Sequence, residues 1–308
     1  MAAGGEHGTK AIVAAFFANL GIAIAKFVGF IVTGSTSMLA ESVHSVADTG
    51  NQALLLLGGR RARREPTPLH PFGFGRERYF WSFVVALVLF SLGSLFAIYE
   101  GVHKLEVADD HSEEISYLVN YVILSVAILL EAFSLRTAVV ESNKVRGSQS
   151  WSQFVRRAKS PELPVVLLED IGAMAGLVIA LSALITADVT GDVMWDGIGT
   201  LAIGGLLGII AIFLAIEMKG LLIGEAADED VQRAITGAMS ADEGVKRVIY
   251  SHTQHIGPEE VLVAAKVEFS SSLSGRELAD TIDRIEASVR QAAPVATAIF
   301  LEPDISRD

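Results

Sequence analysis

Six long apolar stretches separated by short polar links dominate the first two thirds of the chain. They cover residues 10–33, 37–58, 79–101, 115–138, 163–186 and 196–218. Each is close to the ~20 residues that a helix needs to cross a ~30 Å hydrocarbon layer. The third and sixth stretches are nearly uninterrupted, whereas the second and fifth carry ionisable residues in mid-span. Such residues are costly in lipid and usually serve a function. The pattern predicts an all-α membrane domain of six transmembrane helices.

After the sixth stretch the pattern changes to that of a small α+β domain. We expect helices at 226–240 and 274–292, and strands at 244–253, 260–270 and 295–302. Valine-rich, loosely alternating residues indicate the second strand, and helically spaced apolar residues indicate the second helix. Ser274 and Glu277 have the spacing of a capping box at its start. The chain is therefore expected to divide into a membrane domain, 1–224, and a C-terminal domain, 225–308.

Composition narrows the class of protein. The chain is 51% hydrophobic and 19% charged, whereas soluble domains usually carry about 25% charged residues. It has no cysteine, which excludes disulfides, iron–sulfur clusters and thiol nucleophiles and leaves His, Asp and Glu for any metal site. The net charge of −12 argues against a nucleic-acid partner. Two thirds of that excess lies in residues 225–308.

Basic residues in the links predict the orientation. Links 59–78 and 139–162 are rich in Lys and Arg, whereas link 102–114 holds a single Lys and link 187–195 holds none. Short basic links mark the cytoplasmic side, so both termini and the C-terminal domain are expected to be cytoplasmic. The first residues resemble neither a secretory signal nor a transit peptide. We expect a multi-pass protein of the cell or inner membrane, with lipid as its surroundings.

The second span carries candidate metal ligands. His44 and Asp48 are four residues apart and share one helix face, with Glu41 and Gln52 close to the same stripe. Imidazole and carboxylate together suit Zn²⁺, Mn²⁺, Fe²⁺, Co²⁺ or Ni²⁺. The alternative is a polar pair that joins helices by hydrogen bonds. The lipid surroundings favour a metal or proton site.

The fifth span adds two adjacent carboxylates, Glu169 and Asp170. Neighbours in a helix point about 100° apart, so one can face His44 and Asp48 while the other faces a different helix. We predict a metal site of His44, Asp48 and Asp170, with Glu169 or Glu41 as fourth ligand. Metal binding requires ionised carboxylates and neutral imidazole. A site that alternates between metal-loaded and protonated forms would exchange metal for protons.

Five stretches of the chain form recognisable motifs: SMLAESVHSVADTGNQALLLLG, HPFGFGRERYFW, LLEDIGAMAGLVIA, TQHIGPEEVLVAAKVEF and IFLEPD. Together they resemble the motifs of the cation diffusion facilitator family, in its zinc-transporter-9-like branch. The resemblance implies a six-span divalent-metal/proton antiporter that exports metal from the cytoplasm, with a cytoplasmic ferredoxin-like domain and a homodimeric assembly. It also implies that His44 and Asp48 are the first ligand pair and Asp170 the last. We expect a transporter and not an enzyme, with Zn²⁺ as its favoured substrate and Mn²⁺, Fe²⁺, Co²⁺ and Cd²⁺ as other candidates.

Three departures from the family pattern change the metal chemistry. The residue four before Asp170, often His in the family, is Val166. In the link before the third span, only His70 remains of an Asp and two His, with Thr67 and Phe74 at the other positions. We therefore expect His70 to be structural, beside Pro71.

The third departure lies in the tail, where many members hold a metal cluster at the dimer interface. Lys266 and Leu301 occupy the aligned positions, and the tail keeps only His252 and His255. We expect dimerisation without tail-bound metal, and His252 and His255 as a surface pair. In the fourth span, Glu131 is expected to hydrogen-bond to a neighbouring helix.

Two functions of other classes remain open. An intramembrane metal-dependent hydrolase would also place His and carboxylates in lipid, but the chain has neither HExxH nor GxSxG. A non-transporting metal sensor would fit the departures in the link and the tail. The His44, Asp48 and Asp170 set argues for transport instead.

Overall fold

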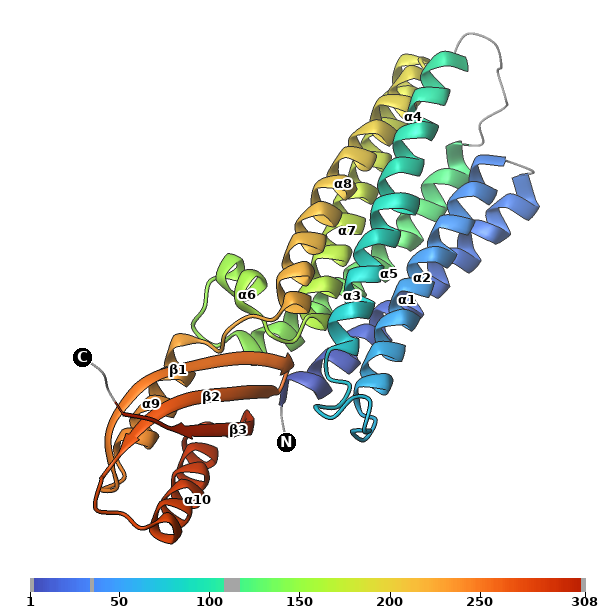
Figure 1. Ribbon diagram of the computed structural model, residues 1–308. Coiled ribbons are helices and arrows are strands. Elements are labelled where there is room, and N and C mark those ends of the chain that lie inside the picture. Colours follow the sequence, from blue (N-terminus) through green and yellow to red (C-terminus); the bar gives the residue numbers. More distant parts are fainter. Residues whose placement is uncertain (1–2, 34–35, 108–116, 306–308) are drawn as a thin grey trace. The chain divides into compact units, whose positions relative to one another are not determined.

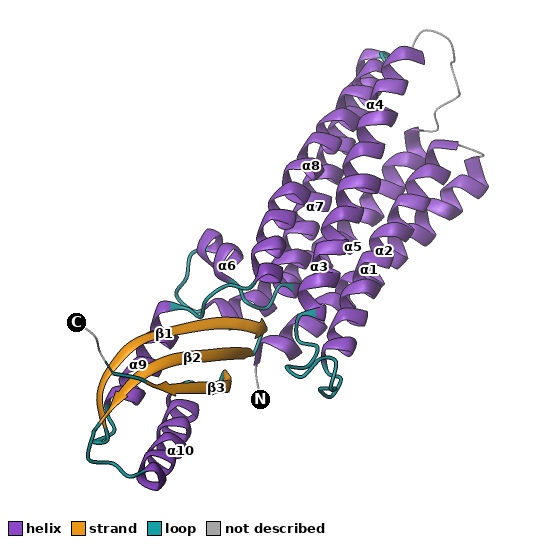
Figure 2. Ribbon diagram, viewed as in Figure 1, coloured by secondary structure: helices purple, strands orange, loops and turns teal. Residues whose placement is uncertain are grey.

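The protein is described by a computed structural model that covers residues 3–33, 36–107 and 117–305. The described residues form two compact units. One consists of the chain up to Arg61 together with Arg78–Lys219, and the other of Ala62–Glu77 together with the residues from Gly220 onward. The first unit is helical, and the second contains the sheet (Figures 1 and 2).

The first unit is a bundle of long helices. In chain order these elements are α1 (Ala3–Thr33), α2 (Thr36–Ala62), α3 (Glu77–Val88), the π-helix η1 (Leu89–Leu95), α4 (Phe96–Val107), α5 (Tyr117–Arg146), α6 (Trp151–Arg157), α7 (Glu162–Thr190) and α8 (Met194–Ile223). Among the described residues, five stretches are long and apolar enough to cross a membrane: Gly8–Val32, Glu77–Glu106, Leu118–Arg146, Glu162–Thr190 and Met194–Ile223. The remaining expected span, α2, is 27 residues long but falls outside this set because polar residues interrupt it.

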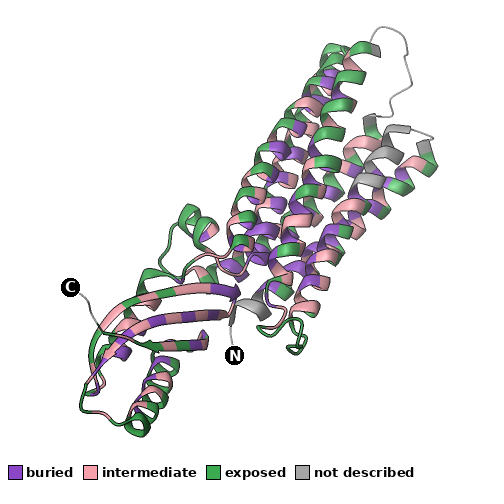
Figure 3. Cartoon of the chain, in the orientation of Figure 1, coloured by how far each residue is buried: buried purple, intermediate pink, exposed green. Residues whose placement is uncertain are grey.

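Small residues bring the central helices together. α1 packs against α5 and α7, and α5 packs against α7. Ala11, Ala15 and Ala18 of α1 are buried, as are Ala127 and Ala138 of α5, and buried positions recur along the helices (Figure 3). Small side chains permit close backbone approach between membrane helices, where van der Waals packing drives association.

The third span contains a π-helical turn that meets α8. Ser94, within η1, donates a hydrogen bond to the carbonyl oxygen of Gly204, 2.8 Å away. A Cβ on Gly204 would lie 2.8 Å from Cγ1 of Ile98 and 2.9 Å from its backbone nitrogen. Glycine is thus required for this close approach, and π-turns inside helices often accompany functional regions.

The second unit contains an α+β domain whose elements match those expected from sequence within a few residues. They are α9 (Glu229–Ser240), β1 (Val245–Gly257), β2 (Glu260–Phe269), α10 (Gly275–Ala292) and β3 (Ala296–Pro303). The sheet order is β1-β2-β3, with β1 antiparallel and β3 parallel to β2. α9 and α10 cover the face that carries Val263 and Val267, and the capping box of Ser274 and Glu277 is present.

The link between α2 and α3 belongs to the same unit as this domain. The ring of Phe72 makes an edge-to-face contact with Phe300 of β3, with centroids 6.4 Å apart. Gly75 lies against the end of β1, where an added Cβ would be 2.8 Å from the Cα of Gly257 and 2.9 Å from the carbonyl oxygen of Ile256. The end of the link is therefore packed against the C-terminal domain, whereas residues 63–71 are exposed.

Replacing Gly75 with alanine is expected to detach the link. The new methyl group would meet backbone atoms that cannot move aside, and overpacking of this kind typically costs about 1–3 kcal/mol. Trypsin should therefore cleave after Arg76 at least threefold faster than in the unmodified chain, as followed by mass spectrometry. Gly275→Ala is the control, because nothing lies within 4 Å of its added Cβ. Equal cleavage rates in both variants would contradict the packing described for the link.

Candidate metal site

α2 carries the first predicted ligands. Glu41 and His44 lie in α2, but their side chains fall outside the described part of the structure. Asp48 is half-buried one turn beyond His44. Asn51 and Gln52, at the next turn, are almost fully buried. This stretch of α2 therefore turns polar side chains into the helix bundle.

Glu169 of α7 is bound to α2. Its side chain is 5% exposed, and its two carboxylate oxygens accept hydrogen bonds from different amides. Nδ2 of Asn51 lies 3.1 Å from Oε1, and Nε2 of Gln52 lies 2.7 Å from Oε2. We call these three residues the amide–carboxylate clamp. A buried carboxylate is tolerated when donors are supplied to it, and the clamp supplies two.

Asp170 points to a different helix. Its side chain is 1% exposed, and Oδ2 accepts a hydrogen bond of 2.8 Å from the hydroxyl of Ser134 in α5. The two adjacent carboxylates of α7 thus contact two different helices, as their angular separation along a helix predicts. α2, α5 and α7 all contribute polar groups to this region of the bundle.

The described residues do not form a closed metal site. Over the part of the chain that the structure describes, no three or more His, Asp or Glu side chains converge closely enough to hold a metal ion. Asp48, Glu169 and Asp170 are described, whereas the side chains of Glu41 and His44 are not. The five-residue ligand set therefore stays a prediction.

Two charged residues of the bundle change the picture derived from sequence. Lys26 of α1 is only 9% exposed, and Glu131 of α5 only 1%. Neither carboxylate oxygen of Glu131 has a hydrogen-bond partner among the described residues, so the expectation that it bonds to a neighbouring helix stays a prediction. Lys26 was missed by the sequence analysis, although a single charge inside an apolar span is the signal that finds such residues.

Ion pairs tie the ends of the helices. Arg78, at the start of α3, binds Glu162, at the start of α7, through both carboxylate oxygens; Nη2 lies 2.8 Å from Oε2. At the other end of the third span, Lys104 of α4 pairs with Asp196, near the start of α8, at 2.8 Å. Bidentate arginine–carboxylate pairs fix geometry as well as charge, so the first pair sets the position of α3 against α7.

The family is shown by comparison with known proteins. The model of the cation efflux transmembrane domain matches residues 12–223. The chain belongs to the cation diffusion facilitator family. It is 32% identical to metal tolerance protein C4 of Arabidopsis thaliana over 270 residues, which are 87% of this chain and 58% of the relative. It is thus an integral, multi-pass membrane protein of a family of transporters and not of enzymes.

Two further relatives support the branch expected from the motifs. They are proteins named proton-coupled zinc antiporter SLC30A9, mitochondrial. The one from Xenopus laevis is 33% identical over 281 residues, covering 90% of this chain and 49% of the relative. The one from Homo sapiens is 31% identical over 261 residues, covering 84% of this chain and 45% of the relative. The chain spans about half the length of these curated relatives.

His70, in the link between α2 and α3, contacts its own neighbours in that link. The ring of His70 makes an edge-to-face contact with Phe74, with centroids 4.7 Å apart. The backbone N–H of His70 donates to the hydroxyl of Thr67 at 3.1 Å. Thr67 and Phe74 stand where the family resemblance places the other ligands of this link. The expected structural role of His70 stays a prediction.

In the tail, a lysine lies between two carboxylates. Lys266 of β2 pairs with Asp304 at 2.9 Å and Glu302 at 3.2 Å. Hydrogen bonds to these two carboxylates raise the pKa of the Lys266 ammonium. At this position in the family's metal cluster, the chain therefore carries a fixed positive charge.

Of the two tail histidines expected at the surface, His252 is exposed but His255 is buried. His252 is exposed and packs against Tyr250, with ring centroids 4.9 Å apart. His255 is only 5% exposed, and its Nδ1 lies 3.1 Å from the carbonyl oxygen of Gly257. Residues three apart in a strand point to opposite faces, so these two histidines cannot share one ligand.

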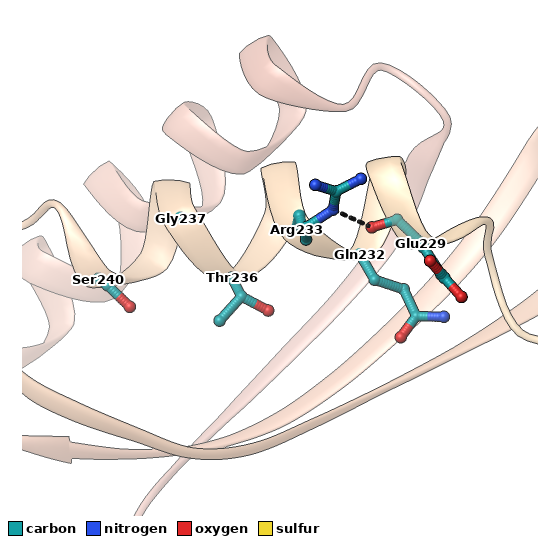
Figure 4. A pocket seen from close by; sticks show the side chains of 6 residues that line it. All are labelled: Glu229, Gln232, Arg233, Thr236, Gly237 and Ser240. Atoms are coloured by element: carbon teal, nitrogen blue, oxygen red, sulfur yellow. Dashed lines mark hydrogen bonds between the residues drawn. The ribbon is translucent and has the colours of Figure 1, made fainter.

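A shallow pocket on the second unit offers no metal site. It is lined by one face of α9, from Glu229 to Ser240 (Figure 4). Arg233 folds back there, with Nε 3.4 Å from the carbonyl oxygen of Glu229. One carboxylate beside a guanidinium group is not a ligand set for a divalent cation.

The clamp between α2 and α7 should appear as an energetic coupling. We expect Gln52→Ala and Glu169→Ala to show a coupling free energy of about 1–3 kcal/mol, because removing either partner leaves the other polar group buried. Equilibrium unfolding in mixed detergent, with metal chelated, measures it. The control cycle pairs Gln52→Ala with Glu162→Ala on the same helix, since Glu162 binds Arg78 instead. A coupling near zero in both cycles would contradict the clamp.

Proposed function

We propose that this protein is a Zn²⁺/proton antiporter that exports metal from the cytoplasm by alternating access. The observation that carries the proposal is the pair of buried carboxylates in α7, Glu169 and Asp170, one of them bound to α2. Gln52 of the clamp lies one helical turn beyond Asp48, on the same face. The clamp therefore supports a transport site between α2 and α7.

The proposed ligands are His44, Asp48 and Asp170, with a fourth carboxylate for which Glu169 and Glu41 are the candidates from sequence. Such a set suits Zn²⁺, and a glutamate at the fourth position shifts preference toward Mn²⁺ or Fe²⁺. Protons compete with metal for the same ligands, which couples the two flows in opposite directions. The name of the SLC30A9 relatives, proton-coupled zinc antiporter, supports both substrate and counter-ion.

The proposed topology has six spans, both termini in the cytoplasm, and a ferredoxin-like C-terminal domain that forms a homodimer. Apolar surface on that domain supports the dimer. Tyr250 and Phe300 are 42% and 55% exposed on the sheet. They lie at positions that pair with Lys266 and Ala264, on the face of β2 opposite the two helices.

Transport requires the predicted ligands. In proteoliposomes with an internal pH-sensitive dye, a Zn²⁺ gradient should drive proton flux in the opposite direction. Asp48→Ala and Asp170→Ala should each reduce that flux at least tenfold, because each removes a charged ligand. Asp283→Ala, on α10 of the C-terminal domain, is the control and should keep it. Unchanged flux in both ligand variants would reject this site.

A competition series separates the remaining alternatives. Flux measured with Zn²⁺ against Mn²⁺, Fe²⁺, Co²⁺ and Cd²⁺ gives the order of preference. We expect Zn²⁺ to compete best. Preference for Mn²⁺ or Fe²⁺ would assign the second candidate substrate. Metal binding without flux of any ion would instead indicate a sensor.

A further inference from the structure

Glu131 is a buried carboxylate that lacks a donor. Its side chain is 1% exposed, and neither oxygen has a hydrogen-bond partner among the described residues. In the hydrocarbon region no bulk water can supply one. A carboxyl group held there is either protonated or compensated by a cation.

The helix geometry directs Glu131 toward the predicted site. Ser134 lies three residues later in α5 and therefore on the same face. Its hydroxyl donates to Asp170 at 2.8 Å, which shows that this face of α5 meets α7. Glu131 thus faces the interface that contains the last ligand implied by the family resemblance.

The charged neighbours of Glu131 come from three other helices. Asp170 and Glu169 of α7 and Asp48 of α2 act on it electrostatically, Asp170 the most strongly, and Lys26 of α1 is the neighbour of opposite sign. The three carboxylates are the described members of the predicted ligand set. Four ionised carboxylates in one buried region repel one another, and either protons or a cation relieve that repulsion.

Glu169 is the less suitable fourth ligand. Both of its oxygens already accept amide hydrogen bonds from α2, and replacing those bonds by a metal would release the clamp. The position where family members often carry histidine is Val166, which is fully buried and apolar. Asp170 of α7 accepts one hydrogen bond, through Oδ2, whereas neither oxygen of Glu131 has a hydrogen-bond partner among the described residues.

We propose that Glu131 is a direct ligand of the transported metal ion, beside His44, Asp48 and Asp170, and that Glu169 positions α2 against α7. The inference rests on the proposed function and names a residue of the same site. No three ligand side chains converge among the described residues, so the proposed site closes around the ion when the ion binds. The ion removes the repulsion that keeps two carboxylates apart.

Zinc binding to the purified full-length chain in detergent tests the assignment. Glu131→Gln preserves shape and removes the charge, and is expected to weaken Zn²⁺ binding at least tenfold in a titration against a chelating dye. Glu131→Asp should recover part of the affinity. The control is Glu141→Gln, also on α5 and also buried, but paired with Lys144; its affinity should stay within threefold of the unmodified chain.

Metal preference gives a readout that a structural role would not move. Removing one carboxylate ligand leaves imidazole as a larger share of the ligand set, and imidazole favours Zn²⁺ whereas carboxylates favour Mn²⁺. Glu131→Gln should therefore lose more affinity for Mn²⁺ than for Zn²⁺. Should Glu131→Gln not purify as a folded protein, the same shift in preference is expected in Glu131→Asp, whose shorter side chain reaches the ion less well.

The outcomes separate this inference from the proposed function. Zn²⁺ affinity and metal preference unchanged in Glu131→Gln, in a chain that transports zinc, overturn the ligand assignment alone. Unchanged binding with loss of proton flux also overturns it, since Glu131 would then carry protons. If the unmodified chain binds Zn²⁺ but moves none, the transport proposal fails, while weakened binding in Glu131→Gln still upholds the ligand.

Discussion

The hydrogen bonds from Asn51 and Gln52 to Glu169 are the interaction on which the arrangement of the candidate site depends. They place a carboxylate in the bundle interior and fix the depth of α2 against α7. Each bond to a charged acceptor is worth about 1.5–3 kcal/mol where water is excluded. α2 is too polar to be held in lipid by hydrophobicity alone. Its polar groups therefore need partners inside the protein, and α7 supplies them.

The rest of the bundle is built to bring those partners together. Buried alanines in α1 and α5 allow the helices to approach closely, and α5 then meets α7 through Ser134 and Asp170. The Arg78–Glu162 pair fixes the start of α7 against α3. Polar groups of α2, α5 and α7 consequently face one region, while apolar side chains cover the outside of the helices.

Periodicity in the sequence predicted the helices and most of the strand positions, but not the contacts between them. Apolar runs of about 20 residues predicted the long helices, and the spacing of Ser274 and Glu277 predicted a capping box that the structure contains. His255 shows the limit. The predicted strand 244–253 ends before His255, whereas β1 runs to Gly257, and the direction of the side chain depends on the register of β1 against β2. It is buried, although a surface position was expected.

The sequence by itself determined the family, the long apolar helices and the carboxylates within them, because each is encoded in local composition and in motifs of contiguous residues. Only the tertiary structure decided which carboxylates are already bound. Glu169 and Glu131 are both acidic residues within apolar helices, yet one accepts two amide hydrogen bonds and the other has no hydrogen-bond partner among the described residues. That difference arises from residues over a hundred positions apart in the chain meeting across a helix interface, and no local pattern records it.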